Sequence, residues 1–463
     1  MNKLHFLRAT WCDVILVESN GLFALIDTAY ERTFPRIRAY LDKLGVKRLE
    51  FILITHYHKD HYGSLDALLD TYPVGMVYMK KFSGLNISDG SGHTASTAFN
   101  VSETARCEGM CDHARRVSKL TVLDGSVGHV VLGDFDFRLF GETDAIREMY
   151  EDPASPYYHQ IRFGENTNSV ALYADVQGTK IYLGADANDE AHDYPKYSCQ
   201  NTQYARAIGE AIDLMKVPHH CCGGIFSDES LRILQPRYAL ATNFTATING
   251  QMKANRDKLL AANPDMQLLV SDACGYCFTI GERGSLSFEE FDRLPQITFE
   301  ELAPEQAQEY WPLHINYLIQ DGIIEDEEDV EYFSSSDYRD VITEQMQWEK
   351  DRHHLVYMIC EGKRVGAASY RIFSQEDGQC FLMDFWVFKP FRGDGFGHHC
   401  YMALEAYTQA QGAKYHEINC DGKDRIRFWK ALGFVDDGID EWGDPLLRKD
   451  PMEYKTYGGN PFA

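Results

Sequence analysis

Short apolar runs alternate with amphipathic stretches over residues 1 to about 294. Residues 14–17 and 22–26 flank Asn20-Gly21, a pair that favours a tight turn, so they predict a β-hairpin. Residues 34–44 repeat apolar positions at helical spacing. Such alternation of short strands and helices predicts an α/β fold for this part of the chain.

A different order of elements begins near Pro295. Residues 297–302 read as a first strand, and helices are expected from Pro304 and from about Tyr338. Three strands and a helix follow, at 355–360, 364–373, 380–388 and 397–411. The pattern therefore predicts two domains, residues 1–294 and 295–463, the second also mixed α/β.

The apolar run 51–54 leads directly into His56-Tyr-His58-Lys-Asp60-His61. Strand ends are where α/β proteins place their chemistry. Imidazole and carboxylate are the ligands that zinc prefers when it must keep a position open for water. We interpret this cluster as a metal site, because a polar loop with scattered histidines does not explain its density.

Two later strands end on the same types of ligand. Residues 180–185 lead into Asp186, and residues 215–218 lead into His219-His220. Taken singly, Asp186 could cap a helix and the histidines could belong to an ordinary loop. Together with the first cluster, they indicate a centre for two metals, because a carboxylate at a strand end can bridge two ions.

This order of motifs resembles the metallo-β-lactamase superfamily, over roughly residues 8–285. One branch, the lactamase-type domain of competence-related DNA-uptake proteins, is suggested by residues 13–16, 25–28, 168–172, 216–220 and 271–275. The resemblance implies an αββα sandwich. It also implies that His56 and His58 bind one metal, that Asp60, His61 and one of the paired histidines bind the second, and that Asp186 bridges them. We favour His219 over His220, because it is nearest the strand end.

Two features depart from the superfamily pattern. Cys221-Cys222 stand where the branch usually has Gly, and the superfamily's further His on the first metal has no clear match. The candidates for that position are His93, His113, His129, Glu142 and His159. Residues 143–165 predict a surface loop, with a lid over the metal site as the alternative.

The resemblance implies hydrolysis by a metal-activated water, with Asp60 among the catalytic residues. Phosphodiesters are the expected substrates for this branch, while esters, thioesters and lactams remain alternatives. Two zinc ions are the default expectation, and manganese and iron are alternatives wherever oxygen ligands dominate.

A glycine-rich turn joins the strand 380–388 to the helix at 397. Glycines 393, 395 and 397 let backbone N–H groups crowd around an anion at the helix N-terminus, which favours pyrophosphate. Arg392-x-x-Gly395-x-Gly397 and Phe428 to Phe434 resemble the GNAT family of acetyltransferases, over about residues 297–450.

The GNAT resemblance implies an acetyl-CoA site. Its expected residues are Val387, Arg392, Gly393, Asp394, Gly395, Phe396 and Gly397. Asp384 stands where an acid often accepts the proton of the acceptor amine; a surface strand residue is the alternative. Trp429 stands where the family often has a Tyr acid, so Tyr401 is a substitute candidate.

The composition of the chain limits the classes of molecule that we expect it to bind. The 463 residues include 45 Lys plus Arg and 70 Asp plus Glu, giving a net charge of −25. This charge disfavours nucleic acid and anionic membranes. The acidic run 325–329 reads as a solvated loop or helix start, with attraction of a cationic substrate as the alternative. Twelve cysteines in so long a chain do not indicate a disulfide framework.

No apolar run reaches the length of a membrane span, and the first residues lack a secretory signal, so we expect a cytoplasmic protein. The main hypothesis is a metallo-hydrolase fused to an N-acetyltransferase, both acting on small molecules. One domain that has lost catalysis and serves for binding or sensing is an alternative, and a DNA nuclease is another. The oligomeric state stays open.

Overall fold

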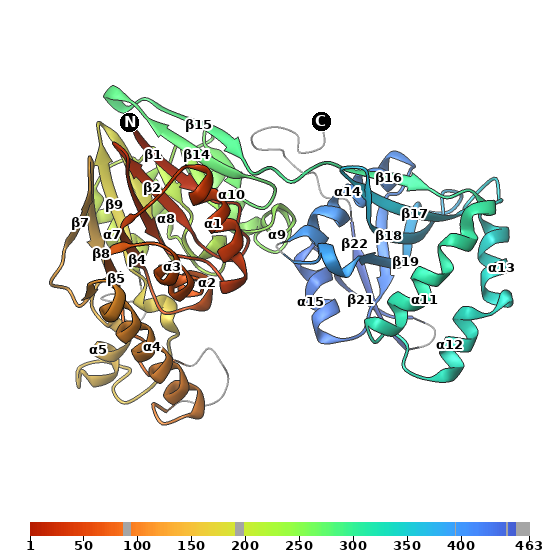
Figure 1. The fold of residues 1–463 in the computed structure, drawn as a ribbon, viewed down its shortest axis with the longest axis horizontal. Coiled ribbons are helices and arrows are strands. Elements are labelled where there is room, and N and C mark those ends of the chain that lie inside the picture. Colours follow the sequence, from red (N-terminus) through yellow and green to blue (C-terminus); the bar gives the residue numbers. More distant parts are fainter. Residues whose placement is uncertain (87–93, 190–198, 394, 441–442, 451–463) are drawn as a thin grey trace. The chain divides into compact units, whose positions relative to one another are not determined.

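The computed structural model describes residues 1–86, 94–189, 199–393, 395–440 and 443–450. It contains two compact units (Figure 1). The first comprises Met1–Ile248 and Met252–Arg293, and the second takes over at Leu294. Within the described residues, no helix is long and apolar enough to cross a membrane. All twelve cysteines are free thiols.

The first unit is built on two sheets. One has the strand order β15-β14-β1-β2-β3-β4-β5-β6 and the other β13-β12-β11-β10-β9-β8-β7. The strands of the first sheet are β1 (Asn2–Phe6), β2 (Ile15–Ser19), β3 (Leu22–Ile26), β4 (Leu49–Ile54), β5 (Val74–Met79), β6 (Leu120–Val122), β14 (Gly275–Ile280) and β15 (Leu286–Phe291). Those of the second are β7 (His129–Leu132), β8 (Phe135–Phe140), β9 (Ala171–Val176), β10 (Thr179–Leu183), β11 (Leu214–Lys216), β12 (Tyr238–Ala241) and β13 (Gln267–Val270).

Strand β4 shows why the sheets pack face to face. Successive side chains of a strand point to opposite faces. Phe51 and Leu53 therefore join the core between the two sheets, whereas Ile52 and Ile54 pack with the helices outside. A strand buried on both faces must be apolar throughout, which is the pattern of its sequence.

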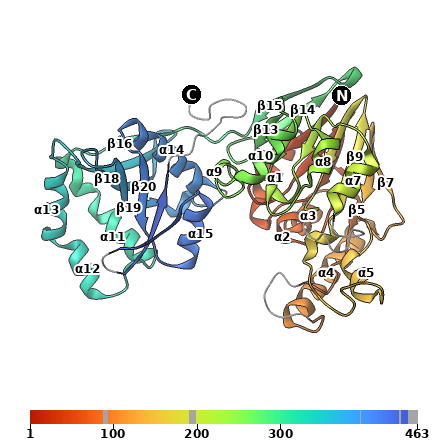
Figure 2. The same ribbon diagram turned by 180° about the vertical axis from the view of Figure 1, so that it is seen from behind.

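Helices cover both outer faces and complete an αββα sandwich, which confirms the predicted architecture. Figure 1 looks onto α1, α2 and α3, and Figure 2 onto α7, α8 and α10. The helices are α1 (Phe34–Lys43), α2 (Lys59–Tyr62), α3 (Leu65–Thr71), α4 (Ala98–Val117), α5 (Ala145–Glu151), α7 (Gln200–Ile208), α8 (Asp228–Leu234), α9 (Thr245–Asn249) and α10 (Lys253–Ala262). Short 3₁₀ turns are η1 (Glu31–Thr33), η2 (Glu165–Asn168), η3 (Pro218–Cys221) and η4 (Glu282–Gly284).

The second unit has one mixed sheet, with the order β16-β17-β18-β19-β20-β22-β21. Its strands are β16 (Ile297–Glu301), β17 (His353–Cys360), β18 (Lys363–Ile372), β19 (Gln379–Val387), β20 (Tyr415–Asn419), β21 (Val435–Ile439) and β22 (Pro445–Lys449). Its helical segments are η5 (Pro304–Glu309), α11 (Trp311–Gln320), α12 (Glu327–Ser334), α13 (Ser336–Gln345), η6 (Lys389–Phe391), α14 (Phe396–Ala410) and α15 (Lys423–Ala431). The acidic run 325–329 thus opens α12, and Asp326 caps that helix.

Strands β19 and β20 pair over only part of their length. Their parallel pairing covers Gln379–Phe381 with Tyr415–Glu417, whereas β19 continues to Val387, paired on its other edge with β18. From Leu382 onward, the edge of β19 that faces β20 has no ladder partner among the described residues. An unpaired strand edge of this kind offers backbone N–H and C=O groups to a ligand.

Candidate metal centre and acyl-transfer cleft

Hydrogen bonds at the end of β4 position the histidines that follow this strand. Asp27, after β3, accepts hydrogen bonds from the backbone N–H and the hydroxyl of Thr55, both at 2.8 Å. The N–H groups of His61 and Tyr62 then bond the His58 carbonyl oxygen at 2.9 and 3.0 Å, which starts the short helix α2. This local turn gathers the three imidazoles of the sequence motif.

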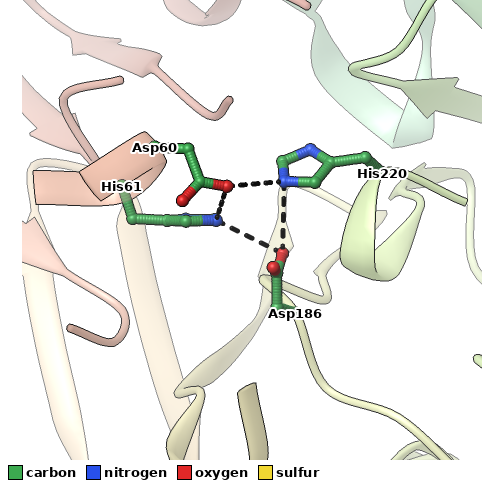
Figure 3. Close-up of side chains that lie close together, drawn as sticks. All are labelled: Asp60, His61, Asp186 and His220. Atoms are coloured by element: carbon green, nitrogen blue, oxygen red, sulfur yellow. Dashed lines mark hydrogen bonds and ion pairs between the residues drawn. The ribbon is translucent and has the colours of Figure 1, made fainter. Parts of the chain in front are cut away.

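Asp60, His61, Asp186 and His220 point toward one another from three separate segments (Figure 3). His61 Nε2 lies 3.6 Å from Asp60 Oδ2 and 3.3 Å from Asp186 Oδ1. His220 Nε2 lies 3.2 Å from Asp60 Oδ2 and 3.7 Å from Asp186 Oδ1. Candidate ligand atoms from all four residues thus lie within 4.8 Å of one another.

A second group of candidate ligands consists of His56, His58 and Asp186. His56 Nε2 lies 3.0 Å from His58 Nδ1 and 3.8 Å from Asp186 Oδ2. Asp186 therefore turns one carboxylate oxygen to each group, Oδ1 to the first and Oδ2 to the second. This is the arrangement that a carboxylate bridging two ions requires.

The protonation of the second group, His56, His58 and Asp186, suits metal binding. Burial, then the neighbouring His61, lowers the pKa of His56 well below its usual value, and burial lowers the pKa of His58. Burial alone would raise the pKa of Asp186, but His61 and His220 outweigh it and hold that pKa well below its usual range. Neutral imidazoles and ionised carboxylates are the forms that ligate metals.

Buried polar atoms at the centre of the site also fit a cation. Among the described residues, His61 Nε2 and Asp186 Oδ1 are buried without a hydrogen-bond partner. Burial opposes charge on His61, yet Asp186, Asp27 and Asp60 together hold its pKa well above the usual value. The surrounding carboxylates thus favour positive charge here, which a metal ion supplies directly.

An outer layer of polar groups orients the histidines. His61 Nδ1 lies 2.7 Å from Asp27 Oδ2, and His220 Nδ1 lies 2.8 Å from the Thr242 hydroxyl, which donates to Asp13 at 2.6 Å. Asp13 in turn pairs with buried Lys216. Partners on the far ring nitrogen fix which nitrogen faces the metal. Asp13 and Asp27 therefore support the site rather than ligate.

The predicted acetyl-CoA loop adopts a conformation that requires glycine. Gly393 and Gly395 have φ of 106° and 79°, and α14 begins directly afterwards. A Cβ on Gly397 would come within 3.2 Å of the Phe428 ring. Asp394 lies outside the described residues. The N-terminus of α14, where a helix attracts an anion, therefore follows directly on this glycine-rich loop.

Arg392 has a partner within the protein. Its guanidinium pairs with Asp321 at 2.6 and 3.0 Å, and its Nε donates to the Val387 carbonyl oxygen at 2.6 Å. These contacts tie the loop to the end of α11 and to the last residue of β19. Arg392 thus positions the loop, and its charge is already matched by a carboxylate.

Asp384 lies on the part of β19 that extends beyond its pairing with β20. It forms a hydrogen-bonded pair with a histidine. Its Oδ2 lies 2.9 Å from Nε2 of His314 on α11, and the His314 side chain is only 2% exposed. Trp429 is buried against Phe385 and Tyr401. The Tyr401 hydroxyl is also buried, 2.7 Å from His416 Nδ1, so its place in the core does not suit a catalytic acid.

Comparison with known proteins finds both of the predicted families. A family model described as "Metallo-beta-lactamase superfamily" matches residues 10–138, and one described as "Acetyltransferase (GNAT) family" matches residues 321–434. The chain joins a metallo-β-lactamase superfamily domain to a GNAT family domain. The predicted competence-protein branch stays a prediction.

Individual relatives cover parts of the chain. "Uncharacterized protein YobT" of Bacillus subtilis is 41% identical over 66 residues, 14% of this chain and 28% of that protein, so the match spans less than a third of its curated relative. The metallo-β-lactamase fold protein YhfI of Bacillus subtilis is 10% identical over 62% of this chain and 100% of its own, with a TM-score of 0.35. The PaiA N-acetyltransferase of Thermoplasma acidophilum, solved with coenzyme A, is 13% identical over 34% and 99%, with a TM-score of 0.28.

Within the metallo-β-lactamase domain, His220 rather than His219 stands beside Asp60, contrary to our preference from the sequence. His219, His220 and Cys221 have φ of 46°, 51° and 71°, so η3 reverses the chain immediately after β11. This turn carries His220 over Asp60 and directs His219 to Asn166, whose Nδ2 lies 2.9 Å from His219 Nε2. Nearness to the strand end was therefore a poor criterion for choosing between His219 and His220.

The histidines and the glutamate suggested for the first metal do not join the described ligand groups. His113 bonds Asp66 and Asp70, and His129 bonds Asp136. Glu142 accepts from the Gly128 N–H, and His159 packs on Tyr150 and Tyr158. His93 lies outside the described residues.

Residues 143–165, expected to be a loop, contain α5 and lead into η2, where Asn166 contacts His219. No sequence pattern singled out Asn166, because a single asparagine belongs to no ligand motif. The only feature of the sequence that drew attention to Asn166 was its position just before the segment 168–172.

Proposed function

We propose that this chain is a bifunctional enzyme, in which the metallo-β-lactamase domain hydrolyses an ester-type bond and the GNAT domain acetylates an amine. Both domains belong to families of enzymes. The hydrolase half is supported above all by the convergence of Asp60, His61, Asp186 and His220 within 4.8 Å. We further propose small-molecule substrates and a cytoplasmic location, as the acidic composition and the first residues suggest.

In the hydrolase site, Asp60, His61, Asp186 and His220 would hold one divalent cation, and His56, His58 and Asp186 would contribute to a second. Bound cations would polarise the substrate oxygen and lower the pKa of a coordinated water. Asp27 keeps Nε2 of His61 aimed at the site. Asp60, whose side chain is 20% exposed, is the most accessible carboxylate and can accept a hydrogen bond from the attacking water.

A phosphodiester is the proposed substrate class, and zinc is the proposed metal, with manganese and iron as alternatives. Hydrolysis of bis-nitrophenyl phosphate by the purified chain, measured with its metal content, tests this half. We expect Asp60→Ala to abolish hydrolysis and leave acetyl transfer unchanged. Asp70→Ala, which removes an exposed carboxylate from α3, is the matched control. Full hydrolysis by the Asp60→Ala chain, or a wild-type chain that binds no metal, would contradict the proposal.

In the GNAT domain, the loop before α14 would hold the pyrophosphate of acetyl-CoA, and the free edge of β19 would orient the thioester. The acceptor nitrogen attacks the thioester carbonyl carbon, the C–S bond breaks, and the CoA thiolate leaves. Asp384 would take the proton that the amine loses. Since Trp429 and Tyr401 offer no suitable acid, the thiolate would leave without a dedicated proton donor.

Acetyl-CoA binding is the most direct test of this half. We expect acetyl-CoA to raise the unfolding temperature of the wild-type chain, and a panel of amines to reveal the acceptor through release of the free thiol. Gly395→Val should remove the stabilisation, because valine resists a φ of 79° and blocks the loop. No stabilisation of the wild-type chain would support the alternative of a domain without transferase activity.

A further inference from the structure

We propose that the acceptor of the GNAT domain is an arylalkylamine, a primary amine joined by a short chain to an aromatic ring. The inference rests on the proposed acetyltransferase function and names the class of amine that this domain takes. The amino group would lie against the carboxylate of Asp384, and the ring of the acceptor would pack on Phe333 and Tyr338.

Asp384 and Trp386 lie on the face of β19 that α11 covers. They are two positions apart in the strand, so their side chains point to the same side of the sheet. Asp384 Oδ2 lies 2.9 Å from Nε2 of His314, and the Trp386 ring stacks on the Tyr317 ring with centroids 4.5 Å apart. Phe385 packs on the opposite face of the sheet. The acid of the site therefore faces α11.

Aromatic rings surround the His314 imidazole that bonds Asp384. The helices α11, α12 and α13, which carry most of these rings, lie side by side (Figure 1). The rings with centroids 5.6–6.2 Å from that of His314 belong to Tyr310, Trp311, Phe333, Tyr338 and Trp386. The Asp384 carboxylate thus lies at the edge of an aromatic cluster.

The aromatic cluster has a core part and a part that solvent reaches. Tyr310, Trp311 and Trp386 are no more than 5% exposed. Phe333 and Tyr338 are half-buried, and their ring centroids lie 5.0 Å apart in an edge-to-face contact. Aromatic rings bind further rings in offset or edge-to-face arrangements, and their faces attract ammonium groups. Phe333 and Tyr338 therefore offer a surface for the ring of an acceptor.

No cationic side chain matches the charge of Asp384 among the described residues, where its ion-pair partner is His314. His314 Nδ1 is buried without a hydrogen-bond partner in the same part of the chain. A second proton on this imidazole would bury an unsatisfied N–H group, which is unfavourable, so the ring bonds Asp384 as a neutral donor. An ammonium group on the acceptor would supply the missing positive charge.

The helices next to Asp384 carry a strongly negative charge. Residues 311–345, which span α11, α12 and α13, contain ten Asp or Glu, one Arg and no Lys. The acids of the run 325–329 are exposed. A field of this sign attracts cations and repels anions. The charge thus favours an amine without carboxylate or phosphate groups, and the rings beside Asp384 favour an arylalkylamine over a polyamine.

Matched small molecules would test the ring and the charge separately. Phenethylamine has both features, hexylamine lacks the ring, and phenylacetate replaces the amine by a carboxylate. Release of free thiol from acetyl-CoA by the full-length chain gives kcat/KM, and calorimetry in the presence of CoA gives Kd. We expect kcat/KM to be about 10-fold higher for phenethylamine than for hexylamine or spermidine. Phenylacetate should not bind, because Asp384 repels it.

Substitution of one ring should change recognition of the amine alone. We expect Tyr338→Leu to raise the KM for phenethylamine by about 2- to 10-fold and to leave the KM for acetyl-CoA unchanged, because leucine is apolar but has no ring. Tyr338→Phe keeps the ring and should restore the wild-type KM. Trp348→Leu, which removes a 42% exposed ring that lies over Arg371, is the matched control. Circular dichroism would establish folding, and Phe333→Leu replaces Tyr338→Leu if that variant does not fold.

The outcomes separate this inference from the proposed function. A kcat/KM for hexylamine or spermidine that equals or exceeds the value for phenethylamine would overturn the aromatic acceptor and leave the acetyltransferase standing. So would a chain that acetyl-CoA stabilises but that neither binds nor acetylates phenethylamine. Phenethylamine that binds beside CoA without being acetylated would support the site and contradict the transferase activity.

Discussion

Asp13 and Lys216 form a buried ion pair, and Asp13 also contacts His220 of the candidate metal site. Burial alone would raise the pKa of Asp13, but Lys216 and His220 outweigh it and lower that pKa. Lys216 also donates to the Ala185 carbonyl oxygen at 2.9 Å. The pair therefore ties β11 to the segment that carries Asp186.

Removing Lys216 should destabilise the first domain severely. Lys216→Met leaves the Asp13 carboxylate buried without its partner, and breaking such a pair costs about 3–5 kcal/mol. Urea unfolding followed by fluorescence would measure the loss. Lys180→Met, which breaks the surface pair of Lys180 with Glu210, should cost no more than about 1 kcal/mol. Equal stabilities for the two variants would show that the Asp13 charge is not buried.

His314 should matter for acetyl transfer, although the sequence pattern did not single it out. Its imidazole orients Asp384, so we expect His314→Gln to lower kcat by about 10- to 100-fold and to leave the KM for acetyl-CoA unchanged. Asp384→Asn should lower kcat at least as much. Since the two side chains act as one unit, the double variant should be no slower than Asp384→Asn. Additive losses would instead mean that His314 acts independently of Asp384.

At the scale of residues, the sequence predicts ligands that follow a strand within a dense motif. The structure brings His56, His58, His61 and Asp186 together, and the sequence singled them out because they follow apolar runs. The contact of Asn166 with His219 could not be predicted, since it depends on where η2 packs. The choice between His219 and His220 depended on a left-handed turn of non-glycine residues, which no sequence pattern predicts.

At the scale of elements, strands were easier to predict than helices. The 20-residue helix α4 lies in a stretch for which the sequence analysis predicted no helix. Its buried face is made of Cys107, Met110, Cys111 and Ala114, at helical spacing. Cysteine and alanine are weak markers of an apolar face, so the pattern was visible only once the helix was known.

Two buried histidines, His353 and His416, and the half-buried His398 should make the second domain sensitive to acid. Burial lowers the pKa of His353, His398 and His416 from 6.5 to about 3. At a pH between about 3 and 6.5, these histidines bind more protons in the unfolded chain than in the folded chain. The free energy of unfolding therefore falls as the pH drops below about 6.5, by about 2 kcal/mol per histidine at pH 5.

Urea unfolding of the second domain at pH 7.5 and pH 5 would measure this loss. His416→Gln keeps hydrogen-bonding groups for Tyr401 and Thr408 but cannot take up a proton. We expect it to reduce the acid-induced loss by about a third, since it removes one of three equivalent contributions. His129→Gln, at an exposed position, should leave the loss unchanged. A His416→Gln chain with the full loss would show that other groups dominate.

At the scale of the whole molecule, the change of sequence pattern near Pro295 predicts a boundary between two domains. β15 ends at Phe291 and β16 begins at Ile297, so the change falls between two strands of different sheets. The net charge of −25 belongs to the chain as a whole, and it disfavours long polyanions as substrates of either domain. A small phosphodiester fits this charge better than DNA does.

Ligands should stabilise the two domains separately. A metal that binds only the folded first domain stabilises that domain alone, and acetyl-CoA does the same for the second; at 100 times Kd the gain is about 2.7 kcal/mol. Calorimetric scans should therefore show two transitions, one lowered by a chelator and the other raised by acetyl-CoA. Asp60→Ala should respond less to the chelator and fully to acetyl-CoA. If each ligand moved both transitions, the domains would unfold cooperatively, and the two catalytic centres would have to be treated as energetically coupled.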